Sequence, residues 1–116
     1  MDISIPELYS RLGISAQELQ SFCEQFPIVE LAFFGSVLRN DFQPSSDIDI
    51  LIRIVPEAHF SLMDLVGLSY KFEEMLDRKV DLIEKDSVEK SPNWLRRQEI
   101  LNNYYVIYES GRLVSA

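Results

Sequence analysis

Apolar residues follow two spacings along the chain, and these predict short strands separated by amphipathic helices. Runs rich in β-branched and aromatic residues predict strands over 28–34, 47–53, 79–84 and 104–108. Apolar positions three or four residues apart predict helices over 6–12, 16–26, 60–76 and from 91 onward. Because strands and helices alternate, the sequence predicts an α/β (α+β) domain in which helices pack against a short mixed or parallel sheet.

The ends of the predicted helices carry local signals. Ser15 and Glu18 have the spacing of a capping box, in which each side chain satisfies a free backbone N–H of the first helical turn. Ser61 and Asp64 have the same spacing at the start of the helix over 60–76. Gly13 is expected to end the first helix, since glycine readily adopts the left-handed conformation that closes a helix.

The helices are expected to bury apolar faces against the sheet. Pro92 suits the first turn of the last helix, and Trp94 and Leu101 are expected to share its core-facing side. Cys23 lies on an apolar helix face and is expected to be a core residue. Gly111 is expected to open a frayed tail. The stripe expected for the helix over 60–76 consists of Leu62, Leu65, Val66, Phe72, Met75 and Leu76.

The composition indicates one globular domain over residues 1–116, with a helical segment at about 1–26 before the first strand. Of the 116 residues, 47% are hydrophobic and 26% are charged, which is ordinary for a folded domain. The chain carries 19 Asp and Glu against 11 Lys and Arg, a formal net charge of −8. We expect no strong nucleic-acid binding, because neutralising phosphates requires a basic surface. A single nucleotide is still compatible with this charge, since a metal ion supplies positive charge locally.

Cysteine usage and the start of the chain predict a cytoplasmic protein without a membrane role. Cys23 is the single cysteine, so no disulfide forms within the chain, as is typical of a reducing compartment. Residues 1–7 have neither the basic start nor the apolar stretch of a signal peptide. The apolar runs are far shorter than the about 20 residues that span a bilayer.

The first candidate chemistry lies in the strand over 47–53. Strand side chains alternate between faces, so Asp47 and Asp49 point the same way while Ile48 and Ile50 point into the core. The two Cα atoms lie about 6.6 Å apart, and the carboxylates repel by ~2–3 kcal/mol at an effective dielectric constant of about 20. Two interpretations stand: a solvated strand face, or a site for Mg²⁺, which combines carboxylates with water and phosphate oxygens.

Asp81 supplies a third carboxylate if the strand over 79–84 pairs beside the strand over 47–53. Three carboxylates on neighbouring strands can hold two metal ions ~3.5–4 Å apart, the arrangement used for in-line phosphoryl transfer. The alternative is an ordinary edge-strand charge, for which Glu84 is an equal candidate by composition.

Gly35 and Ser36 follow the first strand and form a candidate phosphate site. Glycine at the end of a strand permits a ligand to approach the backbone closely, and the free N–H groups of a following helical turn attract phosphate. The alternative is a simple turn. Arg39 also has two interpretations, a phosphate contact or a surface ion pair with Asp41. With Gly35 and Ser36, Arg39 is our candidate for nucleotide binding.

These residues together resemble a known signature. Gly35-Ser36, then residues 37–46, then Asp47-Ile48-Asp49 and a later strand residue Asp81 resemble the DNA polymerase β-type nucleotidyltransferase superfamily. The short chain and the segments 46–51 and 78–82 resemble its minimal branch, the MNT nucleotidyltransferases. The resemblance covers roughly residues 28–108 and does not include the two helices before them.

The chain departs from the family pattern in the turn after Gly35-Ser36. The family commonly has basic and small residues there, whereas this chain has Val37 and Leu38. Asn40 stands where the family commonly has glycine, and asparagine tolerates the left-handed conformation better than most residues. Val37 removes one positive contact to phosphate, while the carboxylates are retained.

The resemblance implies a nucleotidyltransferase fold with a Mg²⁺ site and a nucleotide site. It implies that Asp47, Asp49 and Asp81 bind Mg²⁺ and are catalytic, with Asp81 assisting removal of the acceptor proton. Gly35 and Ser36 are implied to hold the triphosphate, with ATP as the donor of AMP.

The resemblance also implies a partner protein. MNT proteins are often antitoxins paired with a helical HEPN-type ribonuclease toxin, and some transfer AMP to a tyrosine hydroxyl of that toxin. A HEPN-type toxin is therefore the implied partner, with which the chain would form an oligomer. The alternative is a non-catalytic antitoxin or binding module that covers a basic partner, for which the net charge of −8 is suited.

Overall fold

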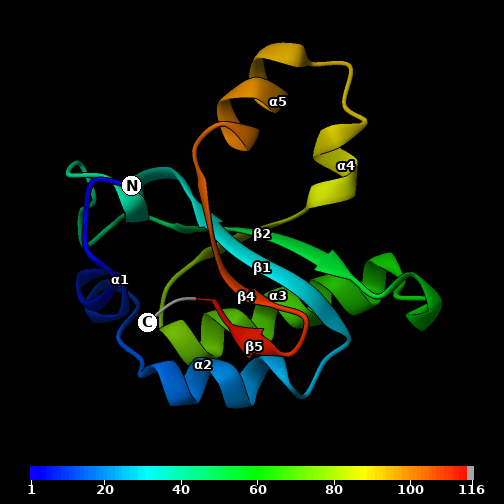
Figure 1. The fold of residues 1–116 in the computed structure, drawn as a ribbon, viewed down its shortest axis with the longest axis horizontal. Coiled ribbons are helices and arrows are strands. Elements are labelled where there is room, and N and C mark those ends of the chain that lie inside the picture. The colour runs from blue at the N-terminus through cyan, green and yellow to red at the C-terminus, as the bar shows by residue number, and fades with distance from the viewer. Residues whose placement is uncertain (115–116) are drawn as a thin grey trace.

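The computed structural model describes residues 1–114, which form a five-stranded sheet flanked by helices (Figure 1). The strands are β1 (Ile28–Phe34), β2 (Ile48–Ile54), β3 (Val80–Glu84), β4 (Tyr104–Glu109) and β5 (Arg112–Leu113). The helices are α1 (Ile5–Leu12), α2 (Ala16–Cys23), α3 (Leu62–Leu76), α4 (Lys85–Glu89) and α5 (Trp94–Leu101), and η1 (Gly35–Leu38) and η2 (Pro56–Ala58) are 3-10 turns. Within the described residues, no helix is both long and apolar enough to cross a membrane.

The strands lie in the order β3-β2-β1-β4-β5, and the sheet is mixed. β1 pairs antiparallel with β2 and β4, whereas β2 pairs parallel with β3. The predicted fold class is therefore confirmed, and each predicted strand is present. β2 begins at Ile48, one residue later than expected, so Asp47 directly precedes the strand.

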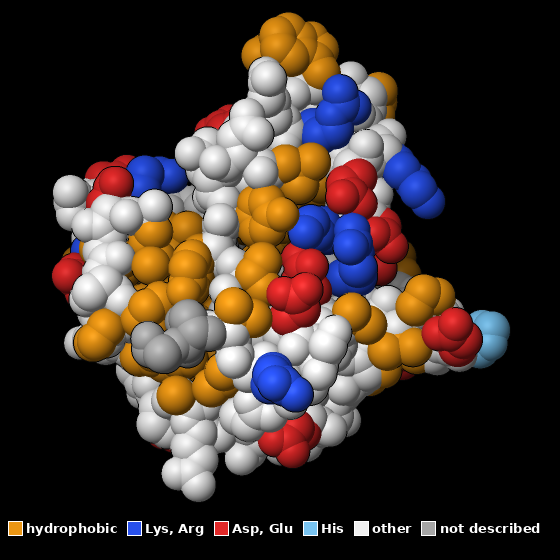
Figure 2. Space-filling view, viewed as in Figure 1, with side chains coloured by type: hydrophobic (Ala, Val, Ile, Leu, Met, Phe, Trp, Pro, Cys, Tyr) orange, Lys and Arg blue, Asp and Glu red, His pale blue; other side chains and the backbone are white. Residues whose placement is uncertain are grey.

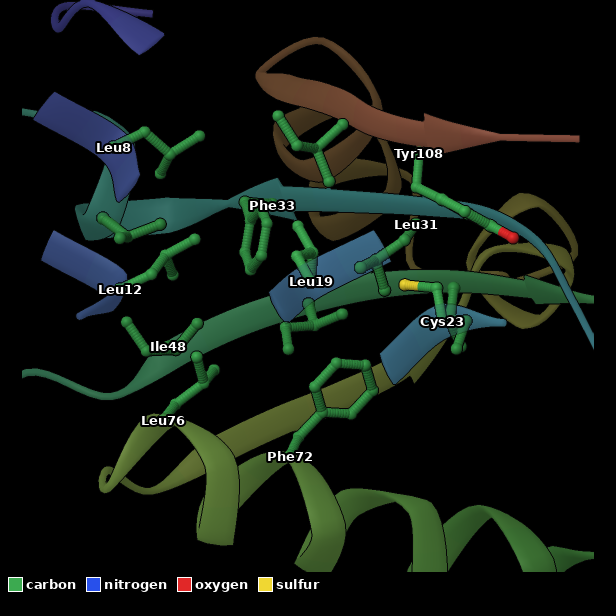
Figure 3. Close-up of a cluster of buried hydrophobic side chains, with 14 of the residues drawn as sticks. Leu8, Leu12, Leu19, Cys23, Leu31, Phe33, Ile48, Phe72, Leu76 and Tyr108 are labelled. Atoms are coloured by element: carbon green, nitrogen blue, oxygen red, sulfur yellow. The ribbon is translucent and has the colours of Figure 1, made fainter. Parts of the chain in front are cut away.

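The helices form a layer on each face of the sheet, with α1, α2 and α3 on one side and α4 and α5 on the other (Figure 1). The alternation of β1 divides the core between these layers. Leu31 and Phe33 point into the larger cluster, whereas Ala32 points into the smaller cluster beneath α4 and α5. In Figure 3, Phe72 and Leu76 of α3 point up toward the strands of the larger cluster.

The predicted caps of α1, α2 and α3 are confirmed, but α2 ends at Cys23, three residues before the predicted end at 26. The Glu18 backbone N–H donates to Ser15 Oγ at 3.1 Å, and the Ser15 N–H donates to Glu18 Oε1 at 3.1 Å. Ser61 and Asp64 form the same pair of bonds at 2.9 and 3.1 Å. Gly13 follows α1 with φ +72°. These contacts lie within a few residues of one another, which is why spacing alone predicts them.

The buried face of α3 differs from the predicted stripe. Leu62 and Val66 are 76% and 39% exposed, whereas Leu68, which was not predicted, is 1% exposed. Leu68, Phe72 and Leu76 are spaced by one helical turn and form the line that contacts the sheet. A helix in which most positions are apolar carries two possible stripes, and packing against the sheet selects one of them.

The helix predicted from residue 91 onward is wrong in its start and its buried face. A separate short helix, α4, precedes α5, and α5 begins at Trp94 with Asn93 as its N-cap, so Pro92 lies outside it. Trp94 is 58% exposed, and Ile100 makes the main core contact, while Leu101 packs at the edge of the smaller cluster. The first turn of α5 lies beyond the sheet, so Trp94 has no core to enter.

The frayed tail predicted from Gly111 onward is wrong for residues 111–114, and residues 115 and 116 lie outside the described part of the chain. Gly111, with φ +91°, reverses the chain so that β5 pairs with β4. Gln20 of α2 holds this strand, because its Nε2 donates to the Gly111 carbonyl at 2.9 Å and its Oε1 accepts from the Leu113 N–H at 3.1 Å.

Candidate active site

The end of β1 brings a glycine against an aspartate of β2. Gly35 has φ +77°, in the left-handed region that favours glycine, and begins η1. A Cβ atom on Gly35 would overlap Asp49 Oδ2 and lie 3.0 Å from Asp49 Cγ. Glycine is therefore required here both by its backbone conformation and by the adjacent carboxylate.

Asp49 and Asp81 are register partners in the parallel pair of β2 and β3. Their side chains consequently leave the same face of the sheet, the face that α4 and α5 cover. Ile48 and Ile50 are fully buried in the other face, as the alternation predicted. Asp47 is exposed immediately before β2, and Asp49 is partly buried.

Electrostatic repulsion is concentrated on Asp49. Burial, followed by the charges of Asp81 and Asp47, raises the pKa of Asp49 from 3.8 to about 6. The three carboxylates are thus near enough to repel. Among residues 1–114, however, no group of three or more His, Cys, Asp and Glu side chains is gathered closely enough to hold a metal ion. A Mg²⁺ ion here would need oxygen ligands from another molecule, such as a phosphate.

Two arginines hold the loop between η1 and β2, the loop that leads to Asp47. Arg78 Nη1 donates at 2.9–3.2 Å to three carbonyl oxygens of this loop, those of Gln43, Pro44 and Ser46. Arg11 Nη1 donates to the carbonyl oxygens of Val37, at 3.1 Å, and Arg39. Both guanidinium groups also stack on the ring of Phe42.

Arg39 forms the ion pair that was one of its two interpretations. Its Nε and Nη2 donate to the two carboxylate oxygens of Asp41 at 3.0 and 3.3 Å. The hydrogen bond from Arg39 lowers the pKa of Asp41 below its usual value. Much of the capacity of Arg39 to bind an anion is therefore already used.

A cavity of about 600 Å³ opens beside Gly35 and Asp49. Its walls come from the N-terminus, the end of β1, η1, the end of α5 and the start of β4. The lining residues are Met1, Asp2, Phe34, Gly35, Leu38, Arg39, Asp49, Glu99, Ile100, Asn102, Asn103 and Tyr104. Three of the six predicted site residues line this cavity. The other three, Ser36, Asp47 and Asp81, are not among its lining residues.

The wall formed by α5 and β4 was not predicted as part of the site. Tyr104 pairs with Phe34 where β4 runs beside β1, and this pairing carries Asn102 and Asn103 to the cavity. Asn103 Nδ2 donates to the Glu99 carbonyl at 2.9 Å, which closes the end of α5. The sequence signals the strand that starts at Tyr104, but no local pattern signals its pairing with β1.

A buried ion pair supports the same wall. Lys85 Nζ donates to Glu30 Oε2 at 2.6 Å, and the two residues are 8% and 9% exposed. Lys85 Nζ also lies 4.6 Å from the centroid of the Tyr104 ring. Figure 2 shows charged side chains of both signs together between α4 and the sheet on this face. This network ties α4 to β1 and to the tyrosine of the cavity wall.

Neither Cys23 nor His59 belongs to the site. Cys23 is fully buried, as predicted, and burial raises the pKa of its thiol to about 12. A thiol with this pKa stays protonated and is a poor nucleophile. His59 is exposed at the end of η2, with φ +53°, and does not line the cavity.

The donor set suits a hard cation that is bound together with a phosphate ligand. Carboxylate oxygens are ligands that Mg²⁺ accepts, and a cation beside Asp49 would relieve the repulsion that raises its pKa. The cavity volume lies within the range of about 300–1,000 Å³ that is typical of small-molecule sites. The cavity is therefore large enough for a nucleotide. Its carboxylate is suited to a nucleotide that is bound together with a metal ion.

Comparison with known proteins identifies relatives of this chain. Residues 16–107 match the family model described as a nucleotidyltransferase domain. Protein adenylyltransferase MntA of Thermococcus cleftensis is 33% identical over 86 residues, which cover 74% of this chain and 82% of that protein.

Solved structures share the fold. A chain from a toxin–antitoxin complex with AMP-PNP has a TM-score of 0.64 at 17% identity, over 83% of this chain and 74% of that chain. A chain from a complex of the tri-AMPylated Shewanella oneidensis HEPN toxin with an MNT antitoxin has a TM-score of 0.58 at 16% identity, over 88% of this chain and 72% of that chain.

Proposed function

The chain belongs to the nucleotidyltransferase domain family, as its sequence predicted, and we propose that it transfers AMP from ATP to a hydroxyl group of a partner protein. The observation that carries this proposal is the pairing of Asp49 with Asp81 beside the turn at Gly35. Asp49 lines a nucleotide-sized cavity, and Asp81 lies beside Asp49 on the neighbouring strand. We further propose Mg²⁺ as the metal and a cytoplasmic site of action, since a chain with a single cysteine needs no oxidising compartment to fold.

The relatives support a protein as acceptor. The Thermococcus cleftensis relative is named a protein adenylyltransferase. One structural neighbour comes from a toxin–antitoxin structure with AMP-PNP, an analogue of ATP, and another comes from a complex with a HEPN toxin that carries AMP groups. We therefore propose a HEPN-type toxin as the partner, so that the chain acts as the antitoxin of a toxin–antitoxin pair and assembles with its toxin.

The proposed reaction uses the carboxylates of β2 and β3. Asp47, Asp49 and Asp81 would hold Mg²⁺, which when bound neutralises phosphate charge and favours attack at the α-phosphorus. The acceptor oxygen forms a bond to the α-phosphorus as the bond to the bridging oxygen breaks. Pyrophosphate leaves with the bonding electrons, and the acceptor proton passes to Asp81. We assign this role to Asp81 because it is exposed and lies on an edge strand.

The test measures binding and transfer separately. Mg²⁺ with AMP-PNP should raise the unfolding temperature of the wild-type protein, and labelled AMP should move from ATP to a HEPN-type protein of the same source. The Asp49→Asn and Asp81→Asn variants should lose transfer, whereas Asp77→Asn serves as the matched control because Asp77 caps α3 away from the cavity. Transfer that persists at the wild-type rate in Asp49→Asn would contradict the proposal.

A second candidate function is neutralisation by covering the partner without catalysis. It is favoured by the net charge of −8, which suits a basic partner. The double variant Asp47→Asn with Asp49→Asn separates the two functions. If this variant still neutralises the partner, occlusion is the mechanism, whereas loss of neutralisation with retained complex formation supports catalysis.

A further inference from the structure

A row of side chains crosses β3, β2, β1 and β4 on one face of the sheet. Asp81 is the register partner of Asp49. Phe34 of β1 is the register partner of Asp49 on one side and of Tyr104 on the other. Register partners on neighbouring strands project from the same face, and α4 and α5 cover that face. The row therefore runs from two carboxylates at the edge strand β3 to two aromatic rings at β4.

This row sets the direction in which a nucleotide can lie. Phe34, Asp49 and Tyr104 line the cavity, whereas Asp81 does not. The phosphates belong at the carboxylate end, beside the turn at Gly35. Neighbouring strands are about 4.8 Å apart, so the backbone of Tyr104 is roughly 10 Å from that of Asp49. A nucleotide whose α-phosphate lies beside Asp49 therefore extends its base along the cavity toward β4.

The Tyr104 ring is held in a fixed position at that end of the cavity. The Nζ atom of Lys85 lies over the ring, 4.6 Å from its centroid, and Lys85 is itself buried and paired with Glu30. Aromatic side chains bind nucleobases by stacking, and they do so with little regard to which base is present. Tyr104 thus offers a stacking surface but no means of choosing a base.

Asn102, which also lines the cavity, has a free amide next to this ring. Within residues 1–114 the side chain of Asn102 forms no hydrogen bond, whereas Asn103 Nδ2 donates to the Glu99 carbonyl at 2.9 Å. Asn103 is therefore used in closing α5. Asn102 keeps both a hydrogen-bond donor and an acceptor for a ligand.

We propose that Tyr104 and Asn102 form the base subsite, in which the base stacks on the Tyr104 ring and the Asn102 amide selects adenine. This inference rests on the proposed function. Asparagine matches adenine because its Oδ1 accepts from the N6 amino group while its Nδ2 donates to N7. Guanine carries a carbonyl oxygen in place of that amino group, so it cannot form both bonds. A base at β4 also leaves the β3 edge open to the acceptor hydroxyl.

The test compares AMP-PNP with its guanine counterpart GMP-PNP, both with Mg²⁺, by calorimetric titration. The wild-type protein should bind AMP-PNP about five- to a hundredfold more tightly, the discrimination expected for one paired amide contact. Asn102→Ala should lose this preference, mainly through weaker binding of AMP-PNP. Asn102→Asp, which keeps the shape of the side chain, should lose it too and repeats the test should the alanine variant unfold. Gln17→Ala is the matched control, because Gln17 is an exposed amide of α2 outside the cavity.

The stacking contact is tested with the same two ligands. Tyr104→Leu, which keeps an apolar side chain but removes the ring, should weaken both analogues by a similar factor of about five- to a hundredfold. Tyr104→Phe keeps the ring and should bind both analogues almost as the wild type does.

Several outcomes would overturn this inference and leave nucleotidyl transfer intact. An unchanged affinity ratio in both Asn102 variants would remove the role of Asn102, and unchanged binding by Tyr104→Leu would remove that of Tyr104. A wild-type preference for GMP-PNP would assign the base contact to the carboxylate of Glu99, which also lines the cavity. Failure of the wild-type protein to bind either analogue would overturn this inference and the proposed function together.

Discussion

Asp49 Oδ2 occupies the position that a Cβ atom of residue 35 would need, so Gly35 and Asp49 are sterically linked. The turn after β1 and the carboxylate of β2 therefore cannot vary independently. A side chain at position 35 would either open the turn or displace the carboxylate, and both changes would alter the candidate site.

Gly35→Ala should abolish transfer and lower the free energy of unfolding by more than the about 1–2 kcal/mol that a left-handed alanine costs. The excess comes from the overlap with Asp49. Gly13→Ala is the matched control, because Gly13 has φ +72° but nothing within 4 Å of its Cβ position. Urea unfolding of the two variants measures the difference. Equal losses would show that the overlap relaxes without cost.

Asp49→Asn should stabilise the protein at pH 7.5 and have little effect at pH 4. The folded-state pKa of about 6 lies above the ordinary value of 3.8, so the folded protein holds this proton more tightly than the unfolded chain does. Stability from Asp49 is thus fully present below about pH 4 and is lost as the pH rises through 6. After allowance for solvent screening, we expect a gain of about 1–2 kcal/mol at pH 7.5. Urea unfolding at both pH values, with Asp77→Asn as control, tests this sign.

Arg78→Ala should loosen the loop over 39–47 without melting the sheet. The variant removes three donated hydrogen bonds and the stack on Phe42, at a cost of about 1–3 kcal/mol. Limited proteolysis should then cut within 39–47 in the variant and not in the wild type. Arg112→Ala should leave the digestion pattern unchanged, and an uncut loop in Arg78→Ala would show that Arg11 holds it alone.

Glu30→Leu and Lys85→Met should each destabilise the protein by about 3–5 kcal/mol, because each leaves a buried charged partner unpaired. The double variant Glu30→Leu with Lys85→Met should recover much of this loss, since an apolar pair carries no desolvation penalty. Chemical unfolding of the three variants measures these values. A double variant as unstable as the single ones would indicate that the contact of Lys85 with Tyr104 dominates.

Contacts between residues close in the chain were within reach of the sequence. The capping pairs of α2 and α3 follow from spacing, and the strands follow from their composition. The burial of Ile48 and Ile50 on one face of β2 also follows from alternation. For Asp81 the sequence allows two arrangements, a place beside Asp49 or an ordinary charge on an edge strand. A single sequence does not decide which strands are neighbours.

Contacts that depend on tertiary packing were out of reach. Tyr104 joins the cavity only because β4 pairs with β1, and Leu68 rather than Leu62 faces the core only because α3 settles on one of two apolar sides. From the sequence, Arg39 could bind either a phosphate or the carboxylate of Asp41. In the structure its loop brings it to Asp41. In each case the residue type was informative, but the neighbour was set by parts of the chain far away.

β3 is the outermost strand on its side of the sheet, and it carries Asp81. No further strand of residues 1–114 flanks it, so the acidic corner formed by Asp49 and Asp81 borders solvent on the β3 side. A bulky macromolecule can approach such a margin broadside, with a hydroxyl on its own folded surface. The open edge therefore does not exclude an acceptor because of its size. Selectivity for one acceptor has to come from the contacts between its surface and the surface of this chain around Asp81.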